Sequence, residues 1–318
     1  MILIETNNKP DANWNERLKE SPYGTIFHST EYALSKQIRG NGTLFLKFID
    51  NTGNIVGQQL VLSSSRFHVG RKFNRIFNKI PKNKILQWHY GPVIFNFEYA
   101  NEISLQLKQY LLKQKCRVSG FSHPFIHNMF SEFKKPFILK PWSTFLINLN
   151  DEKQDIWKKM NKHSVRKNIE RSEKRGVFVK EMSKYDYIKY RKLSIKLGKD
   201  SEISESSIGN QWKLLSKIGY TGFLAYKNEE IVGGISISFF NGYLNEFNIV
   251  RTKRDYEDKL YSQDLLKWKI IEWAKKKGFR YYDFSGANPN PVNSKEEGIL
   301  RYKKKWGGYQ KNYYQLIL

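Results

Sequence analysis

A three-residue sequence occurs twice in this chain, each time at the start of the second arm of a predicted β-hairpin. Ile55-Val56-Gly57 follows the turn Asn51-Thr52-Gly53-Asn54, and Ile231-Val232-Gly233 follows the turn Asn228-Glu229-Glu230. Around the first turn, apolar residues alternate with small or polar ones, which is typical of paired strands. The repeat indicates that one supersecondary unit is used twice, so two similar domains are expected.

The elements after the two hairpins also correspond. Each hairpin is followed by a strand, a helix and a second strand that ends in a proline-containing loop, at His123-Pro124 and at Asn288-Pro289. This is the order of an acyltransferase domain of the GNAT type. We therefore predict an α/β chain (α+β, with a mixed sheet) of two tandem GNAT-like acyltransferase domains, spanning residues 1–142 and 143–318. The 318 residues suffice for two cores.

Local patterns predict individual elements within these domains. Ser29 or Thr30 should cap a helix that runs to Lys36. Apolar residues recur at helical spacing over 262–277, which predicts a strongly amphipathic helix. After it, residues 278–286 contain a short apolar strand, and a loop with two prolines leads to a second short element rich in aromatic residues and lysine.

Two motifs in the second half carry a resemblance to a known family. Asp283-Phe284-Ser285-Gly286 is followed by Gly298 and then by RYKKKWGG at residues 301–308. This resembles the signature of the Fem-type (FemABX) aminoacyltransferases, a DFxG strand end, a glycine and RFKxxFGG. Residues 164–177 (SVRKNIERSEKRGV) resemble the basic helix that opens the second domain in that family. The resemblance implies tandem GNAT-like domains, with the final strand, at 310–318, packed back on the first domain.

The resemblance also implies site residues. Lys303 occupies the lysine of the RFK element and would stabilise an oxyanion, Tyr302 would shape the site, and Arg301 would contact substrate. Lys36 and Lys199 stand where the family binds the phosphates of the acceptor, although Lys199 replaces the usual arginine and would lose its bidentate contact.

Two further residues are candidates for proton transfer. His123 stands where the family commonly has an aspartate before proline, and it would serve as a base near neutral pH. The alternative is a polar loop residue. Glu246 is a candidate acid on the central strand, and the alternative there is a buried partner of a lysine or arginine.

The charge of the chain favours anionic partners. Lysine and arginine number 55 against 30 acidic residues, giving a net charge of +25. Such a field attracts nucleic acid, an anionic membrane surface or a phosphorylated small molecule. Four cations of the basic helix would hold the tRNA acceptor stem through its phosphates: Arg166, Lys167, Arg171 and Lys174. The alternative is a solvated helix in which Glu170 and Glu173 are the partners.

Several kinds of chemistry are disfavoured. Cys116 is the only cysteine, so no disulfide can form within the chain and a cysteine-based metal site is not expected. The chain has no Walker motif, no HExxH and no Gly-x-Ser-x-Gly elbow. We expect no metal and no cofactor. Without a charged-then-apolar leader or a stretch of roughly 20 apolar residues, a soluble cytoplasmic protein is the expectation. We also expect a monomer.

The segment before the long helix of the second domain bears on the identity of the acyl donor. A GNAT enzyme that uses acetyl-CoA has a glycine-rich turn that cradles the pyrophosphate before its long helix. The corresponding segment here, residues 251–264, contains no glycine. This argues against acetyl-CoA and favours the aminoacyl-tRNA donor that the Fem resemblance implies.

Three functions remain as hypotheses. The first is transfer of an aminoacyl group from aminoacyl-tRNA to an amine of a peptidoglycan-type precursor, with a phosphate-bearing or lipid-linked acceptor and peripheral contact with an anionic membrane. The second is a GNAT-type N-acyltransferase that uses acyl-CoA. The third is a non-catalytic RNA-binding protein on the same tandem fold.

Overall fold

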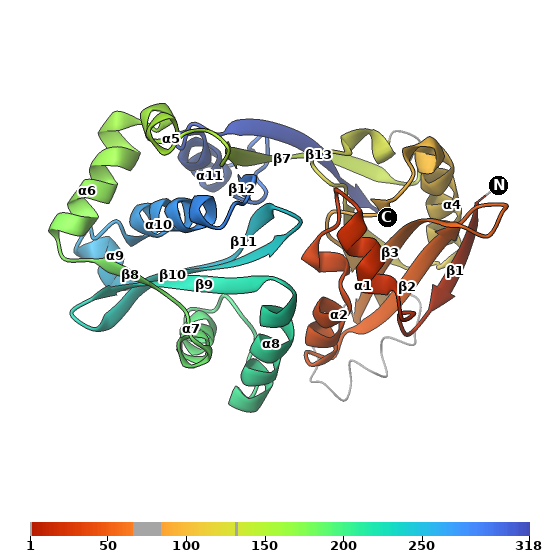
Figure 1. Ribbon diagram of the computed structural model, residues 1–318, viewed down its shortest axis with the longest axis horizontal. Helices are drawn as coiled ribbons and strands as arrows, with labels where there is room; N and C mark the ends of the chain where they lie inside the picture. The colour runs from red at the N-terminus through yellow and green to blue at the C-terminus, as the bar shows by residue number, and fades with distance from the viewer. Residues whose placement is uncertain (1, 66–83, 131–132) are drawn as a thin grey trace. The chain divides into compact units, whose positions relative to one another are not determined.

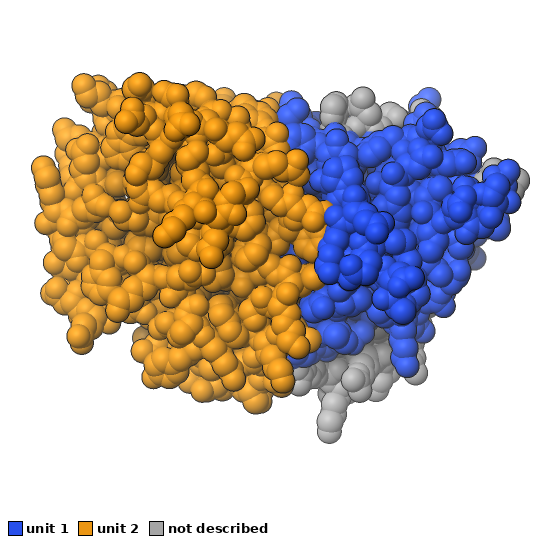
Figure 2. All heavy atoms as spheres, in the orientation of Figure 1, with its two compact units in different colours: residues 1–143, 311–318 blue, residues 144–310 orange. Residues whose placement is uncertain are grey.

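The computed structural model describes residues 2–65, 84–130 and 133–318 (Figure 1). The chain divides into two compact units, residues 1–143 with 311–318 (unit 1) and residues 144–310 (unit 2) (Figure 2). It passes from one unit to the other within β7 (Ile138–Asn148) and again within β13 (Tyr309–Ile317). Each unit contains helices packed on strands, so the chain has the predicted mixed α/β architecture.

In unit 1, the strands follow the order β1-β2-β3-β4-β6-β13, with β5 also paired to β3. The pair β4–β6 is parallel, and the pairs β1–β2, β2–β3, β3–β4, β3–β5 and β6–β13 are antiparallel. The elements are β1 (Leu3–Asn7), α1 (Trp14–Glu20), η1 (Ile26–His28), α2 (Thr30–Gln37), β2 (Gly42–Ile49), β3 (Ile55–Ser65), β4 (Lys84–Trp88), β5 (Val93–Ile94), η3 (Phe97–Tyr99), α4 (Ala100–Lys113), β6 (Arg117–Phe121) and η4 (His127–Phe130).

In unit 2, the strand order is β7-β12-β11-β10-β9-β8, and β11–β12 is parallel. Helices α6 and α10 lie on one face of this sheet, and α7 and α8 lie on the other (Figure 1). The elements are α5 (Lys153–Lys159), η5 (Lys162–Arg166), α6 (Lys167–Lys174), β8 (Phe178–Glu181), α7 (Lys184–Lys196), α8 (Glu205–Ile218), β9 (Tyr220–Lys227), β10 (Glu230–Phe240), β11 (Tyr243–Arg251), α9 (Lys253–Glu257), α10 (Ser262–Lys276), β12 (Tyr281–Asp283) and α11 (Ser294–Lys304).

The repeated Ile-Val-Gly sequence forms the same irregularity in both units. The β2–β3 register skips Val56, and the β9–β10 register skips Val232. Both valines are buried, at 4% and 0% exposure. Each is therefore the extra residue of a β-bulge, which increases the local twist of the strand that carries it. The repeat predicted from three residues is confirmed in the register of the strands.

The glycine of each repeat permits a close approach by the helix that follows. A Cβ atom on Gly57 would lie 3.1 Å from Cδ1 of Ile103 in α4. A Cβ atom on Gly233 would lie 2.5 Å from Oγ of Ser262 in the first turn of α10. A larger residue at Gly57 would also press on the Val93 carbonyl oxygen, at 3.0 Å, so glycine suits the close packing at both positions.

The two units have separate hydrophobic cores. The core of unit 1 forms between α4, through Ile103, Leu107 and Leu111, and the strands that it covers. The core of unit 2 includes the apolar stripe of α10, whose last buried member is Ala274. The amphipathic helix predicted over 262–277 is confirmed at Ser262–Lys276.

The predicted cap of α2 is confirmed, whereas one predicted element differs in the structure. The Ser29 side chain accepts a hydrogen bond from the Tyr32 N–H, so Ser29 is the cap of α2. The short element expected after the proline loop is instead the eleven-residue helix α11. It begins where the Asn293 side chain accepts from the Glu296 N–H, with two glutamates in the first turn.

Candidate active site

The site of unit 2 forms where two parallel strands part. The β11–β12 ladder starts at Tyr243 and Tyr281 and ends at Asn245 and Asp283, although β11 continues to Arg251. Parallel strands that separate leave a crevice at their carboxyl ends, and ligands of α/β folds commonly bind there. The motif residues 283–286 lie at this point of the fold.

Asp283 fixes the end of β12. Its buried carboxylate accepts hydrogen bonds from the Tyr243 hydroxyl at 2.5 Å, the Asn245 amide at 2.9 Å and the Ser285 N–H at 2.6 Å. It also accepts from the Thr144 hydroxyl of β7. One carboxylate therefore ties together the strands on either side of β12 and the loop that follows it.

The Lys303 ammonium is held by the loop after β12. It donates to the carbonyl oxygens of Phe284, Ser285 and Gly286, at 2.7, 2.7 and 2.8 Å. Three consecutive carbonyls converge on one atom because Ser285 adopts a left-handed conformation with φ of 60°. Burial lowers the pKa of Lys303 to about 8, against the raising effect of Glu246.

A buried ion pair lies beside this lysine. Glu246 is the first residue of β11 beyond the ladder with β12, and its carboxylate pairs with Lys267 of α10 and accepts from the Tyr282 hydroxyl at 2.8 Å. The Lys267 ammonium also lies 4.5 Å from the centre of the Phe284 ring. The Glu246 side chain thus has the lysine partner that the sequence left as an alternative, and its role as an acid stays a prediction.

Tyr302 connects three helices. Its hydroxyl donates to Asp264 of α10 at 3.1 Å, and the other carboxylate oxygen of Asp264 accepts from the Asn168 amide of α6 at 3.0 Å. Burial raises the pKa of Asp264, and burial together with Asp264 raises that of Tyr302. The basic helix α6 is therefore joined by two hydrogen bonds to the residue next to Lys303.

The N-terminus of α10 already carries an anion. The fully buried Asp255 accepts from the Ser262 N–H at 2.8 Å with one carboxylate oxygen and pairs with Arg251 through the other. This helix start is where a GNAT domain would bind the pyrophosphate of CoA. A carboxylate in that position satisfies a helix N–H itself, so this donor is not available to a second anion.

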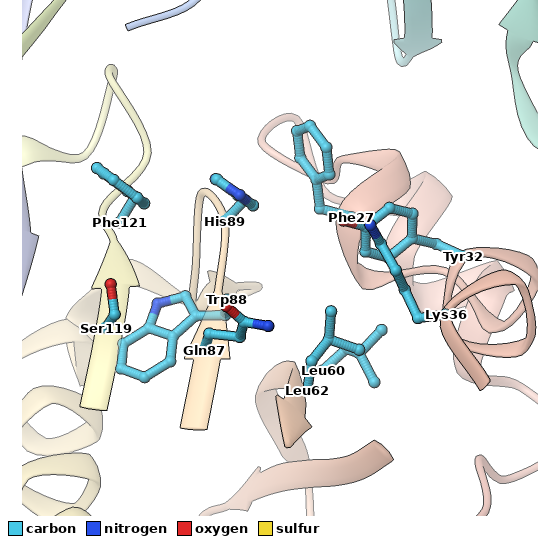
Figure 3. Close-up of a pocket in the computed structure, with 10 residues that line it drawn as sticks. All are labelled: Phe27, Tyr32, Lys36, Leu60, Leu62, Gln87, Trp88, His89, Ser119 and Phe121. Atoms are coloured by element: carbon cyan, nitrogen blue, oxygen red, sulfur yellow. The ribbon is translucent and has the colours of Figure 1, made fainter. Parts of the chain in front are cut away.

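Unit 1 contains a small cavity of about 140 Å³ where β4 and β6 end (Figure 3). His89 and Phe121 follow the last paired residues, and their rings are parallel, with centroids 5.2 Å apart. Lys36 of α2 points from the opposite wall and lies 4.9 Å from the centre of the Tyr32 ring. The complete lining is Phe27, Tyr32, Lys36, Leu60, Leu62, Gln87, Trp88, His89, Ser119 and Phe121.

His28 supports this cavity from behind. Its Nδ1 accepts from the Leu60 N–H at 3.0 Å, so its Nε2 must carry the proton and donate to the His89 carbonyl at 2.9 Å. Burial lowers the pKa of His28 to about 4. The neutral ring therefore fixes the backbone on two sides of the cavity.

His123 lies at the end of β6, as predicted, but inside an aromatic cluster. It is 3% exposed and contacts Tyr23, Tyr90 and Phe125, and its Nδ1 accepts from the Phe125 N–H at 3.2 Å. Burial lowers its pKa to about 3. A ring with this pKa is neutral near pH 7, and its role as a base stays a prediction.

The structure separates the remaining predicted residues into different surroundings. Lys199 donates to the Ile249 carbonyl of β11 at 2.9 Å, whereas Arg301 is exposed on the outer face of α11. Arg171 lies over the Tyr261 ring, and Lys167 and Lys174 are exposed. In unit 2, therefore, Lys303, Tyr302 and Glu246 gather at the end of β12, and the four predicted tRNA contacts follow η5 and α6.

The sequence contained signals for residues that we did not select. Lys267 and Asp264 lie on the apolar stripe of the helix predicted over 262–277, and a charged residue there requires a buried partner. Asp255 lies in the glycine-free segment but gave no separate signal. The cavity residues of unit 1 come from η1, α2, β3, β4 and β6 and share no motif.

Comparison with known proteins places the fold. FemX aligns with a TM-score of 0.64 at 14% identity, over 98% of this chain and 96% of that chain. L-PGS from Bacillus licheniformis aligns with a TM-score of 0.57 at 14% identity, covering 98% and 93%. A tandem GNAT protein from the clavulanic acid biosynthesis pathway aligns with a TM-score of 0.55 at 9% identity, covering 100% and 97%. The chain thus has the Fem-type, tandem GNAT-like fold that the motifs predicted.

Sequence comparison adds no assignment. No protein-family model matches this chain, and no curated protein matches it. Within residues 2–65, 84–130 and 133–318, none of the helices combines the length and the apolar character needed to cross a bilayer. Over the same residues, no three histidine, cysteine or carboxylate side chains gather as metal ligands would.

Proposed function

We propose that this chain is an aminoacyltransferase that moves an aminoacyl group from aminoacyl-tRNA to an amine of a phosphate-bearing, peptidoglycan-type acceptor. The observation that carries the proposal is the desolvated ammonium of Lys303 at the point where β11 and β12 part. The Fem-type fold supports the proposal, because Lys303 is the lysine of the segment that resembles the signature of that family.

The reaction makes modest demands on the protein. The acceptor amine attacks the ester carbonyl of the donor, a C–N bond forms, and the ester C–O bond breaks to release the tRNA hydroxyl. The amine loses one proton, and the leaving oxygen gains one. Between these steps, the carbonyl oxygen carries a negative charge, so an oriented positive charge nearby lowers the barrier.

Lys303 suits this role because its position is fixed before the reaction. Three carbonyls orient its ammonium, and burial lowers its pKa, so its charge is screened less than it would be in solvent. The Tyr302–Asp264 hydrogen bond fixes the neighbouring turn of α11. The oxyanion is stabilised by the field of the ammonium and needs no covalent intermediate on the enzyme.

The cavity of unit 1 supports an acceptor with a phosphate group. Lys36 supplies a cation on one wall, and the stacked His89 and Phe121 rings line the other (Figure 3). Another structural neighbour is the C-terminal domain of a protein named as a lysylphosphatidylglycerol synthetase, from Agrobacterium fabrum, and that name pairs a lysyl group with a phosphate-bearing lipid. Such an acceptor would bring this chain to an anionic membrane surface.

Acyl-CoA is the weaker donor hypothesis. Asp255 occupies the start of α10 with its own carboxylate, and the preceding segment lacks the glycines that let backbone N–H groups surround a pyrophosphate. Saturable binding of charged tRNA without saturable binding of acetyl-CoA is therefore expected. Tight acetyl-CoA binding without tRNA affinity would remove the proposal. Tight tRNA binding without transfer to any amine would favour the RNA-binding alternative.

Replacing Lys303 with methionine should reduce the rate of aminoacyl transfer by about 10²- to 10³-fold, as removal of an oxyanion-stabilising group does elsewhere. The loss should fall on kcat, because Lys303 is not proposed to bind the tRNA body. Single-turnover transfer to a phosphate-bearing amine measures it.

Two controls separate catalysis from folding. Lys303→Arg keeps the charge and a donor set for the three carbonyls, so it should fold like the unaltered protein and keep part of the rate. Lys276→Met removes an exposed lysine of α10 and should change nothing. A Lys303→Met variant with full transfer activity contradicts the assignment.

A further inference from the structure

An open groove runs along the outer face of α11, on unit 2. Its volume is about 540 Å³, and it is separate from the carbonyls that hold Lys303. One wall is helical: Glu297, Leu300, Arg301 and Lys304 recur at spacings of three and four residues and so share one face of α11. Lys305, Asn161 and Pro291 complete the lining.

The groove is strongly cationic. Arg301, Lys304 and Lys305 line it, and Glu297 is the acidic member of the lining. In the part of the chain that the structure describes, no ion pair and no side-chain hydrogen bond involves these three cationic side chains. Cations in the last turn of a helix stabilise its C-terminus, but one or two suffice for that interaction. Three unpaired cations along a groove indicate an anionic ligand.

The groove is anchored on its second side by the segment before the basic helices. The Asn161 N–H donates to the Lys305 carbonyl at 2.8 Å, which joins the end of α11 to the residue that precedes η5. The Asn161 side chain in turn accepts from the His163 and Ser164 N–H groups. The groove therefore lies beside the start of η5, whose first residue is another exposed lysine, Lys162.

The groove and the Lys303 site lie on two different faces of helix α11. Lys303 points to the carbonyls of residues 284–286, and its neighbours Arg301, Lys304 and Lys305 line the groove. The diameter of a helix with its side chains is about 10 Å, so a chain in the groove passes close to the site. The loop from Gly286 to Pro291 connects the carbonyls to the groove wall.

We propose that this groove binds the phosphodiester backbone of a single-stranded RNA end, the unpaired terminus that carries the aminoacyl ester. The inference rests on the proposed function and specifies where the donor would lie. Cationic side chains that contact phosphates fix the register of a strand without reading its bases, which suits a terminus common to many donors. A lipid chain would need apolar walls, whereas Pro291 and the largely buried Leu300 are the apolar lining residues.

The test measures binding of two RNA hairpins, one with a single-stranded 3′ tail and one that is blunt. The unaltered protein should prefer the tailed hairpin. The variant Arg301→Gln/Lys304→Gln/Lys305→Gln should lose about tenfold or more in affinity for the tailed hairpin only. Each single-strand phosphate contact contributes about 0.7 to the slope of log K against log salt, so the slope should fall by about 2.

A matched variant controls for the loss of three charges. Lys196→Gln/Lys213→Gln/Lys217→Gln removes three exposed lysines of α7 and α8 and should leave the tail preference intact. Equal loss in both variants would show a general charge effect and overturn the proposal. So would an unchanged tail preference in the groove variant. Loss of binding to phosphatidylglycerol vesicles with RNA binding retained would assign the groove to a lipid surface instead.

The groove and the proposed function can fail separately. If the unaltered protein transfers aminoacyl groups and the groove variant does so with an unchanged KM for the charged tRNA, the groove assignment is wrong and the function stands. Suppose instead that the unaltered protein transfers no aminoacyl group but prefers the tailed hairpin, and that the groove variant has lost this preference. The proposed function is then wrong, and the groove is an RNA-binding site.

Discussion

Replacing Glu246 with alanine should lower the free energy of unfolding by about 3–5 kcal/mol, because it leaves a buried charge without its partner. The Lys267 side chain is 2% exposed, and its ammonium pairs with Glu246. The Tyr282 hydroxyl would lose its acceptor in the same variant. Urea denaturation followed by tryptophan fluorescence measures the loss, with the slope on denaturant checked for a change in cooperativity.

A double variant tests whether the unpaired charge is the cause. Glu246→Gln/Lys267→Met removes both charges and keeps an oxygen for Tyr282, and it should recover most of the lost stability. If the double variant is as unstable as Glu246→Ala, the loss comes from packing, and the ion-pair argument is wrong.

Lowering the pH from 6.5 to 4.5 should remove about 5 kcal/mol of stability from unit 1 through two buried histidines. The pKa of His28 is lowered to about 4 and that of His123 to about 3. In the unfolded chain, both histidines have a pKa of about 6.5. Below that pH the unfolded state therefore binds protons that the folded state does not bind. The stabilisation is complete above pH 6.5 and is lost as the pH falls toward the folded values.

The size of this predicted loss of stability follows from about 1.4 kcal/mol per pH unit for each of the two histidines. His123→Asn keeps an acceptor for the Phe125 N–H and should reduce this pH dependence by about half. His163→Gln removes an exposed histidine of η5 and should leave it unchanged. Denaturant midpoints between pH 7 and pH 4.5 provide the measurement, and parallel curves for the unaltered protein and His123→Asn would contradict the prediction.

The fold was largely predictable because its repeat has a geometric cause. A bulged valine and a glycine under the long helix are required by the strand twist and by the helix approach, so the same three residues occur in both units. The cap of α2 was predictable for a similar reason, since Ser29 satisfies a backbone N–H that the helix leaves unpaired. Helix α11 was missed although Asn293 and the glutamates after it are ordinary start signals.

The site was predictable only in part. The motif identified Lys303, but its three carbonyl partners depend on Ser285 in a left-handed conformation, which serine rarely adopts. The absence of glycine before α10 argued against CoA, whereas the carboxylate of Asp255 at the helix start emerged only from the folded chain. The cavity and the groove bring together residues from separate segments, and no spacing in the sequence encodes such proximity.

The β13 pairing has a consequence for how the protein is made. Residues 311–318 supply the part of β13 that belongs to unit 1. Within it, Gln315, Leu316 and Ile317 pair with β6 and cover the edge of that strand. These residues are synthesised after all of unit 2. The N-terminal half therefore emerges during translation with one strand edge open, and it must keep that edge from aggregating until its last strand arrives.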